Sequence, residues 1–404
     1  MPATPNEPEL ETAFVETARR FESRISTANL PVYRASTVLF DNLAQARERG
    51  RESATGARHA STYGTVGTPT TFALMDALAE IEGRGHECRA AIMPSGLAAI
   101  TTALLAFLEP GDEVLMSDSV YGPARNFAQG MMTKLGIRPV FFAPTANADE
   151  VAALITPATK VLYLESPGSY TFELQDMRAL CAMARSRGLI SMVDNAWASP
   201  AFARPFDWGV DVSLLPLTKY WSGHSDVLMG AIVVREAHWL PVYRAVRELG
   251  LCVGGDDAFL ILRGLRTAQV RMRQHEKGAL AVARWLQQQP EVLSVLHPGL
   301  PEHPQHELFK RDFSGSSGLF SFELDPRFDE NAIAALVDHR AHFGIGYSWG
   351  GYESLIMPAS IGSLRTIKPW EGGPLVRLHI GLESPDDLIA DLGQGFEAMR
   401  KAST

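Results

Sequence analysis

Residues able to do chemistry stand at the ends of three apolar, strand-like runs. Lys219 follows the run VSLLPL (212–217), and Asp194 follows the apolar residues of the run MVDN (192–195). The third run ends in PSGLAAI (94–100), where serine and glycine precede an apolar, helix-like segment. A buried charge without a partner is costly. These side chains are therefore either solvated loop residues or members of one site.

Each feature alone has an ordinary explanation. A lysine after a strand can be a loop residue, and an aspartate there more often caps a helix. Gly96 can belong to a simple turn, although free N–H groups at a helix start also bind anions. Together, an anion cradle, a buried carboxylate and a strand-end lysine are what pyridoxal phosphate requires. The combination predicts that Lys219 forms an imine with this cofactor and has a depressed pKa when free.

The elements that must bring these ends together alternate along the chain. Helix-like segments separate most of the strand-like runs, and this alternation predicts an α/β fold with a mostly parallel sheet and helices on both faces. Such sheets bind ligands at the carboxyl ends of their strands, where the three features stand. The strand-like runs cover 89–95, 112–117, 138–144, 160–167, 189–195, 211–217 and 230–235.

The flanking segments suggest three divisions of the chain. Residues 1–60 combine a helix-like segment (11–23) with an extended arm, residues 61–255 form the α/β domain, and residues 256–404 form a smaller α+β domain. The polar, glycine-containing tract 47–61 is interpreted as a loop. Further predictions are a helix from Thr70 to Gly83, a long helical stretch over 257–289, and strands over 318–324 and 374–382.

Composition limits the classes of function. The chain has 404 residues, with 46% hydrophobic and 21% charged residues, which is ordinary for a soluble α/β protein. A net charge of −9 argues against nucleic acid or an anionic membrane as a partner. No apolar run is long enough for a membrane span, and the acidic N-terminus lacks a signal core. Three scattered cysteines form no metal or disulfide pattern. We expect a cytoplasmic protein without a metal site.

Eight motifs spread over nearly the whole chain carry a family resemblance. They are YGTVGTPT (63–70), SGLAA (95–99), DSVYGP (118–123), ESPGS (165–169), VDNAWAS (193–199), TKYWSGHSD (218–226), YSWGGYESL (347–355) and VRLHIGLE (376–383). With them the chain resembles the Cys/Met-metabolism family of pyridoxal-phosphate enzymes, and most of all its bacterial cystathionine β-lyase branch. The resemblance implies an aspartate-aminotransferase-like fold (fold type I). It also implies a homotetramer, built as a dimer of dimers, with shared active sites.

The resemblance implies roles around the cofactor ring. Lys219 would bind the cofactor and move protons, Asp194 would pair with the pyridine nitrogen, and Tyr121 would stack on the ring and belong to the catalytic set. Without the resemblance, Tyr121 reads as an ordinary aromatic residue near a strand end.

The resemblance also implies a phosphate site. Its members would be Ser95, the backbone N–H groups of Gly96 and Leu97, and the hydroxyl of Thr218. Tyr63 would reach the phosphate from a neighbouring subunit.

Two positions depart from the usual family pattern at this phosphate site. Many relatives have arginine where this chain has Thr65, and serine where it has Pro216. Arg58 lies close in sequence and could supply the missing charge.

The substrate site is expected near the C-terminus. In LVRLHIGL, Val376 and Leu378 fall on one strand face and Arg377 on the other, which alone would suggest a solvent-facing arginine. The resemblance makes Arg377 the group that grips the α-carboxylate of a small amino-acid substrate through two hydrogen bonds. Ser348 and Trp349 would complete this carboxylate site.

The implied reaction is carbon–sulfur β-elimination. Cystathionine, cystine or another cysteine S-conjugate would yield a thiol, pyruvate and ammonia, with Lys219 as the base for the Cα proton. The nearest alternative is the γ-chemistry of cystathionine γ-lyases and γ-synthases. Those relatives tend to have Glu and Leu where this chain has Tyr347 and Trp349, which favours the β-lyase. A non-catalytic scaffold is a third possibility, and the intact set of cofactor and substrate residues argues against it.

Overall fold

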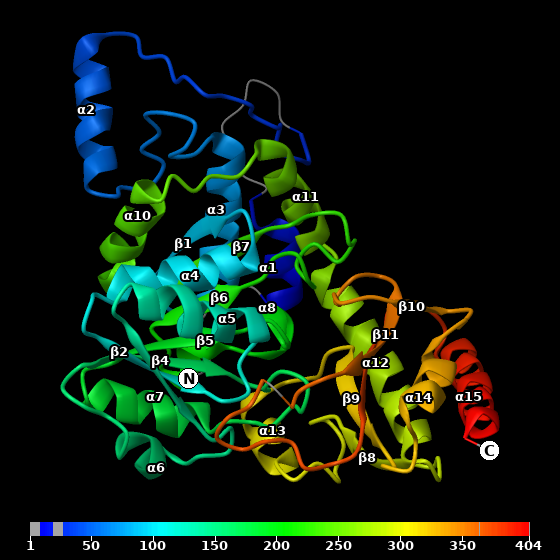
Figure 1. Cartoon of the computed structure of the whole chain (residues 1–404). Helices are drawn as coiled ribbons and strands as arrows, with labels where there is room; N and C mark the ends of the chain where they lie inside the picture. The colour runs from blue at the N-terminus through cyan, green and yellow to red at the C-terminus, as the bar shows by residue number, and fades with distance from the viewer. Residues whose placement is uncertain (1–8, 19–26, 363, 404) are drawn as a thin grey trace.

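The computed structural model describes residues 9–18, 27–362 and 364–403 (Figure 1). Its larger sheet contains all seven predicted strands. The strand order is β1-β7-β6-β5-β4-β2-β3, and β7 alone runs antiparallel to its neighbours. The predicted mostly parallel sheet is confirmed. Its strands are β1 (Cys88–Met93), β2 (Glu113–Ser117), β3 (Arg138–Phe142), β4 (Thr159–Glu165), β5 (Ile190–Asp194), β6 (Val212–Leu215) and β7 (Gly230–Arg235).

Helices bury both faces of this sheet, which explains its nearly uninterrupted apolar strands. Along β4, Val161 and Tyr163 pack into the core on the side of α4, and Leu162 and Leu164 into the core on the side of α7. The covering helices are α3 (Pro69–Glu82), α4 (Gly96–Phe107), α5 (Gly122–Phe127) with a π-helical turn (Ala128–Met132), α6 (Ala148–Ala152), α7 (Met177–Ser186), α8 (Ser199–Phe202), α9 (Pro205–Trp208) and α10 (Trp239–Glu248) after a 3-10 turn (Glu236–His238).

The C-terminal part forms a second sheet with order β10-β11-β12-β9-β8, in which only β10 and β11 pair in parallel. The predicted long helical stretch is two helices, because the chain breaks at Arg266 and Thr267. Both predicted strands are present as β9 and β12. The elements are α11 (Gly255–Leu265), α12 (Ala268–Leu286), β8 (Val292–Leu296), α13 (His306–Asp312), β9 (Leu319–Leu324), α14 (Glu330–Val337), β10 (Phe343–Ile345), β11 (Ser354–Ala359), β12 (Leu375–His379) and α15 (Pro385–Ala402).

The N-terminal region contains the one wrong prediction of secondary structure. Helix α2 (Leu43–Ala54) occupies most of the tract that was interpreted as a loop. The Asn42 side chain caps it by accepting a hydrogen bond from the Gln45 N–H, and Arg49 pairs with Glu52 one turn later. Such a helix has no apolar stripe to recognise, since Ser53 is its only buried residue.

The first predicted helix is shorter than expected. It is present as α1 (Leu10–Glu16), and residues 19–23 of the prediction lie outside the described residues. The division of the chain at residues 60 and 255 stays a prediction. Within the described residues, no helix combines the length and the apolar character that crossing a membrane requires.

Candidate active site

Lys219 lies just after β6, where its amine faces the second sheet. Its Nζ donates a hydrogen bond to the Ser348 hydroxyl at 2.7 Å and lies 4.9 Å from the centre of the Trp349 ring. Burial, and then the positive charge of Arg377, lower the pKa of Lys219 to about 8, while Asp194 acts in the opposite direction. The predicted depressed pKa is therefore present, and the amine can exchange a proton near neutral pH.

Asp194 ends β5 directly beside Glu165, which ends β4. Its side chain is only 6% exposed, and its Oδ1 atom has no hydrogen-bond partner among the described residues. Burial raises the pKa of both carboxyls; the charge of Asp194 adds to the rise at Glu165, whereas the Ala196 N–H and Lys219 oppose the rise at Asp194. A buried acceptor without a donor is uncommon. It fits the protonated ring nitrogen of pyridoxal phosphate, which would supply both the missing donor and a positive charge.

The expected phosphate cradle is the start of α4. The Ser95 side chain caps this helix by accepting from the Ala98 N–H, which leaves the first N–H groups, those of Gly96 and Leu97, without partners inside the helix. A Cβ atom at Gly96 would lie 2.8 Å from Pro216 Cβ, so only glycine allows this close approach. The unusual Pro216 therefore packs against the cradle.

Thr218 is already engaged with the backbone beside this cradle. Its hydroxyl donates to the Met229 carbonyl at 3.2 Å and accepts from the Met229 N–H at 3.0 Å.

Strand β12 supplies the substrate half of the site. Arg377 is only 9% exposed, and its Nη2 donates to the Tyr347 carbonyl at 2.9 Å. Two residues along, His379 Nε2 contacts the backbone of Gly350 and Gly351, so the same strand face holds residues 348–351, the SWGG loop. At Gly350, with φ of +85°, a Cβ would lie 3.0 Å from Lys219 Cα. The loop therefore rests directly on Lys219.

Most of the predicted site residues come together. Lys219, Asp194, Arg377 and Tyr121 lie close enough to shift one another's pKa, and Tyr121 is anchored through its N–H, which donates to Glu165 Oε2 at 2.6 Å. The Tyr121 side chain is 43% exposed. Burial, and then Asp194 and Glu165, raise the pKa of this phenol.

The structure does not bring the N-terminal candidates to this site. Tyr63 is 49% exposed and pairs with Thr37, and no contact recorded among the described residues joins it to Lys219. Arg58 pairs with Glu236 at 3.4 Å and Asp76 at 3.8 Å, so its charge is balanced within its own chain.

Three residues that line the site were not predicted from the sequence as site residues. Glu165 ends β4, Tyr170 belongs to the loop that follows β4, and His379 ends β12 two residues after Arg377. The ESPGS motif was the available signal for Glu165, and strand alternation placed His379 on the same face as Arg377. No pattern indicated Tyr170, whose ring lies 5.5 Å from the Arg377 guanidinium carbon.

Comparison with known proteins agrees with this geometry. Cystathionine β-lyase MetC of Escherichia coli (strain K12) is 41% identical over 393 residues, covering 96% of this chain and 98% of that protein. L-alanine/L-glutamate racemase of Wolbachia pipientis wMel is 40% identical over 390 residues, covering 95% of each.

A solved structure and a family model complete the comparison. The crystal structure of cystathionine γ-synthase from Xanthomonas oryzae pv. oryzae in complex with cystathionine superposes with a TM-score of 0.88 at 31% identity, covering 98% of this chain and 100% of that one. The model of the Cys/Met metabolism PLP-dependent enzymes matches residues 11–397. The predicted resemblance and the predicted fold are thus confirmed, and this chain belongs to the Cys/Met metabolism PLP-dependent enzyme family.

Proposed function

We propose that this protein is a pyridoxal-phosphate-dependent carbon–sulfur β-lyase that cleaves cystathionine to homocysteine, pyruvate and ammonia. Carbon–sulfur lyase activity of this type follows from the family and from relatives named cystathionine β-lyase. One observation carries the proposal. Lys219, with its depressed pKa, faces both the SWGG loop and Arg377, and a buried, unpartnered carboxylate oxygen lies on the cofactor side.

The residues present fit pyridoxal phosphate. Lys219 would hold it as an imine, Asp194 would hold its ring nitrogen, and Gly96 and Leu97 would donate to its phosphate. Thr218 would have to turn its hydroxyl proton away from the Met229 carbonyl to join them. When bound, the cofactor supplies an electron sink for the substrate α-carbon.

The protein side chains would orient the substrate and move its proton. Arg377 offers a guanidinium to the α-carboxylate, and one edge of that group is already fixed by the Tyr347 carbonyl. The neutral Lys219 amine takes the proton from Cα, and the Cβ–S bond then breaks with its electron pair on sulfur. The raised pKa of Tyr121 keeps the phenol protonated at neutral pH, so it can donate a proton to the departing sulfur but cannot act as a base.

The choice between β- and γ-chemistry depends on Trp349 more than on Tyr347. The Trp349 ring lies beside the Lys219 amine, whereas the Tyr347 side chain is 83% exposed and only its carbonyl reaches Arg377. The indole, where the γ-acting relatives tend to have leucine, therefore lies next to the proposed base, which supports the β-lyase proposal.

Amino-acid racemisation is a second candidate, favoured by the similarity to the Wolbachia racemase. A lyase and a racemase both begin by removing the Cα proton. They differ in whether the β-substituent leaves or a proton returns to the opposite face. The test compares kcat/KM for cystathionine, cystine, L-alanine and L-glutamate, with chiral analysis of the last two. Racemisation faster than cleavage of every sulfur substrate would contradict the β-lyase proposal.

We also propose a homotetramer with shared sites, in which Tyr63 serves a neighbouring chain. The exposure of Tyr63, and its pairing with Thr37 rather than with Lys219 among the described residues, support this arrangement. The pairing of Arg58 with Asp76 and Glu236 within its own chain argues against Arg58 as the replacement for the arginine that is absent at Thr65.

A further inference from the structure

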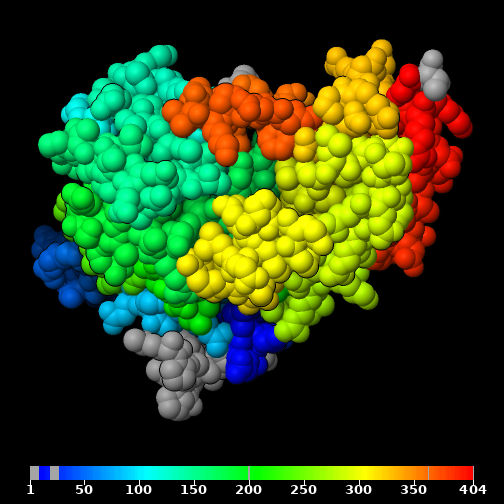
Figure 2. Space-filling view, turned by 90° about the horizontal axis from the view of Figure 1, so that it is seen from below, coloured from blue at the N-terminus to red at the C-terminus, as the bar shows by residue number. Residues whose placement is uncertain are grey.

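The connection between β11 and β12 contains a segment that contacts the larger sheet's domain. We call residues 364–368 the strap. In the space-filling view, the orange segment that contains it reaches across to the cyan-green part of the molecule (Figure 2). The strap therefore joins the domain that carries Arg377 to the loops that follow β2 and β4, and both of these loops border the active site.

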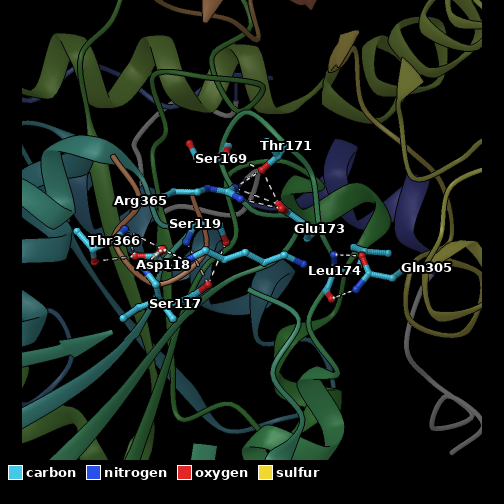
Figure 3. A network of polar contacts seen from close by, with 12 residues as sticks. Ser117, Asp118, Ser119, Ser169, Thr171, Glu173, Leu174, Gln305, Arg365 and Thr366 are labelled. Carbon is cyan, nitrogen blue, oxygen red and sulfur yellow. Dashed lines mark hydrogen bonds and ion pairs between the residues drawn. The ribbon is translucent and has the colours of Figure 1, made fainter. Parts of the chain in front are cut away.

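Asp118, the residue after β2, anchors the strap through its backbone. Its Oδ2 atom accepts hydrogen bonds from the N–H groups of Thr366, Ile367 and Lys368 at 3.0, 2.9 and 3.1 Å (Figure 3). Arg125 donates to Asp118 Oδ1 at 2.8 Å, and both side chains are almost fully buried. These donors outweigh the effect of burial and lower the pKa of Asp118, so the anchor stays ionised.

Arg365 extends from this anchored strap to the loop after β4. Its guanidinium forms an ion pair with Glu173 at 2.8 Å and donates to the Thr171 hydroxyl (Figure 3). The two neighbours of Thr171 both have positive φ, +68° at Tyr170 and +55° at Phe172. Residues other than glycine rarely adopt such angles, and they persist only when their surroundings hold them. The buried Arg365 holds the residue between them.

Tyr170 links this loop to the substrate half of the site. Its ring lies 5.5 Å from the guanidinium carbon of Arg377, within the range of a cation–π contact. Burial lowers the pKa of Arg377, and Tyr170 acts in the opposite direction. A continuous series of contacts therefore runs from the strap through Arg365 and Thr171 to Tyr170, and from Tyr170 to Arg377.

We propose that Tyr170 sets the affinity of this enzyme for the α-carboxylate of its substrate, and that Arg365 is the positioning residue that keeps the Tyr170 ring against Arg377. The proposal rests on the role proposed above for Arg377. A residue of the strap, outside the site, thus controls substrate affinity through one aromatic ring. Cofactor retention does not depend on this series of contacts.

The first test separates affinity from turnover. Tyr170→Ala should raise KM for cystathionine about 2- to 30-fold, the range of a cation–π contact, with a smaller change in kcat. Tyr170→Phe keeps the aromatic face and should stay near the wild-type KM. The dissociation constant of glycine, measured by calorimetry on the holoenzyme, should rise in parallel in Tyr170→Ala. An unchanged KM and glycine affinity in Tyr170→Ala would overturn the proposal.

The second test asks whether Arg365 acts through Tyr170. Arg365→Met should raise KM in the wild-type background and change it little in the Tyr170→Ala background, because coupled residues are non-additive. Equal effects in both backgrounds would contradict the positioning role. Arg400→Met is the matched control: it removes the guanidinium from another ion pair with a buried glutamate, Glu291, and should leave KM unchanged.

A third variant, Arg377→Ala, distinguishes a failure of the inference about Tyr170 from a failure of the proposed carboxylate site. Arg377→Ala should raise KM more than Tyr170→Ala or Arg365→Met does. If it does and Tyr170→Ala does not, the inference fails while the proposed carboxylate site stands. If Arg377→Ala leaves KM unchanged, the carboxylate site itself is wrong. Should Arg365→Met fail to fold, the comparison of Tyr170→Phe with Tyr170→Ala still decides the role of the ring.

Discussion

The two halves of the active site differ in how their buried charges are satisfied. On the cofactor side, Asp194 is buried beside Glu165 with one carboxylate oxygen unpartnered among the described residues. On the substrate side, the buried Arg377 is already stabilised by the Tyr347 carbonyl and the Tyr170 ring. The substrate half is therefore stabilised by the protein's own groups, whereas the proposed cofactor would supply the charge that completes the other half.

The largest loss of activity is expected for substitution of Lys219, which lies between the two halves of the site. Lys219→Ala removes both the imine and the base, so kcat should fall by at least about 10²- to 10⁴-fold, the usual contribution of a positioned acid–base group. Lys310→Ala is a suitable control, because this exposed lysine pairs with Glu307 on its own helix. Borohydride reduction followed by peptide mapping should label Lys219, and a label on another lysine would remove it from this position.

A substitution in the substrate half should weaken the binding of substrate. Arg377→Ala should weaken transition-state and substrate binding by about 2–5 kcal/mol, since it removes one side of a buried charge pair. Steady-state kinetics with cystathionine would measure the loss in kcat/KM, and cofactor absorbance should remain. Loss of the cofactor together with activity would mean that the two halves are not separable as described.

Substitutions of Thr65 and Tyr63 should affect the cofactor site of a neighbouring subunit. Thr65→Arg should tighten cofactor retention on dialysis, because a hydrogen bond to a charged group is worth roughly 1.5–3 kcal/mol. Mixing Tyr63→Phe and Lys219→Ala chains should regenerate activity, since one mixed site holds an intact Lys219 and an intact partner Tyr63. If both single variants are inactive and the mixture stays inactive after demonstrated subunit exchange, the shared-site proposal is wrong.

The smallest effect concerns the stability of the cofactor-free protein. Burial raises the pKa of Asp194 from 3.8 to about 7, so the folded chain holds this proton more tightly than the unfolded chain. The stabilising contribution of this carboxyl is complete below the unfolded pKa and is lost as the pH rises through about 7. Asp194→Asn should therefore raise Tm relative to wild type at about pH 8, with the difference vanishing near about pH 4. A Tm difference that does not change with pH would show that this carboxyl is not perturbed.

The sequence was sufficient to predict the parts of the fold that depend on local patterns. The seven apolar runs became the seven strands because both faces of the sheet are covered, and Lys219 and Asp194 meet because neighbouring parallel strands end at one edge. Helix α2 was missed because caps and ion pairs stabilise it, without an apolar stripe.

Contacts between distant segments were beyond prediction from one sequence. The pairing of Glu165 with Asp194 depends on the register of β4 and β5, which no local pattern specifies. The strap contacts join Asp118 to residues about 250 positions away. Tyr170 belongs to the same class, because its neighbour Thr171 accepts a hydrogen bond from Arg365 in the connection between β11 and β12.

Turnover of cystathionine, with pyruvate and 2-oxobutyrate measured separately, shows directly whether the enzyme cleaves at the β-carbon or at the γ-carbon. Cleavage at the β-carbon, with Lys219 as the base, predicts pyruvate and homocysteine in equal amounts. A predominance of 2-oxobutyrate and cysteine would contradict the account, because the enzyme would then cleave at the γ-carbon.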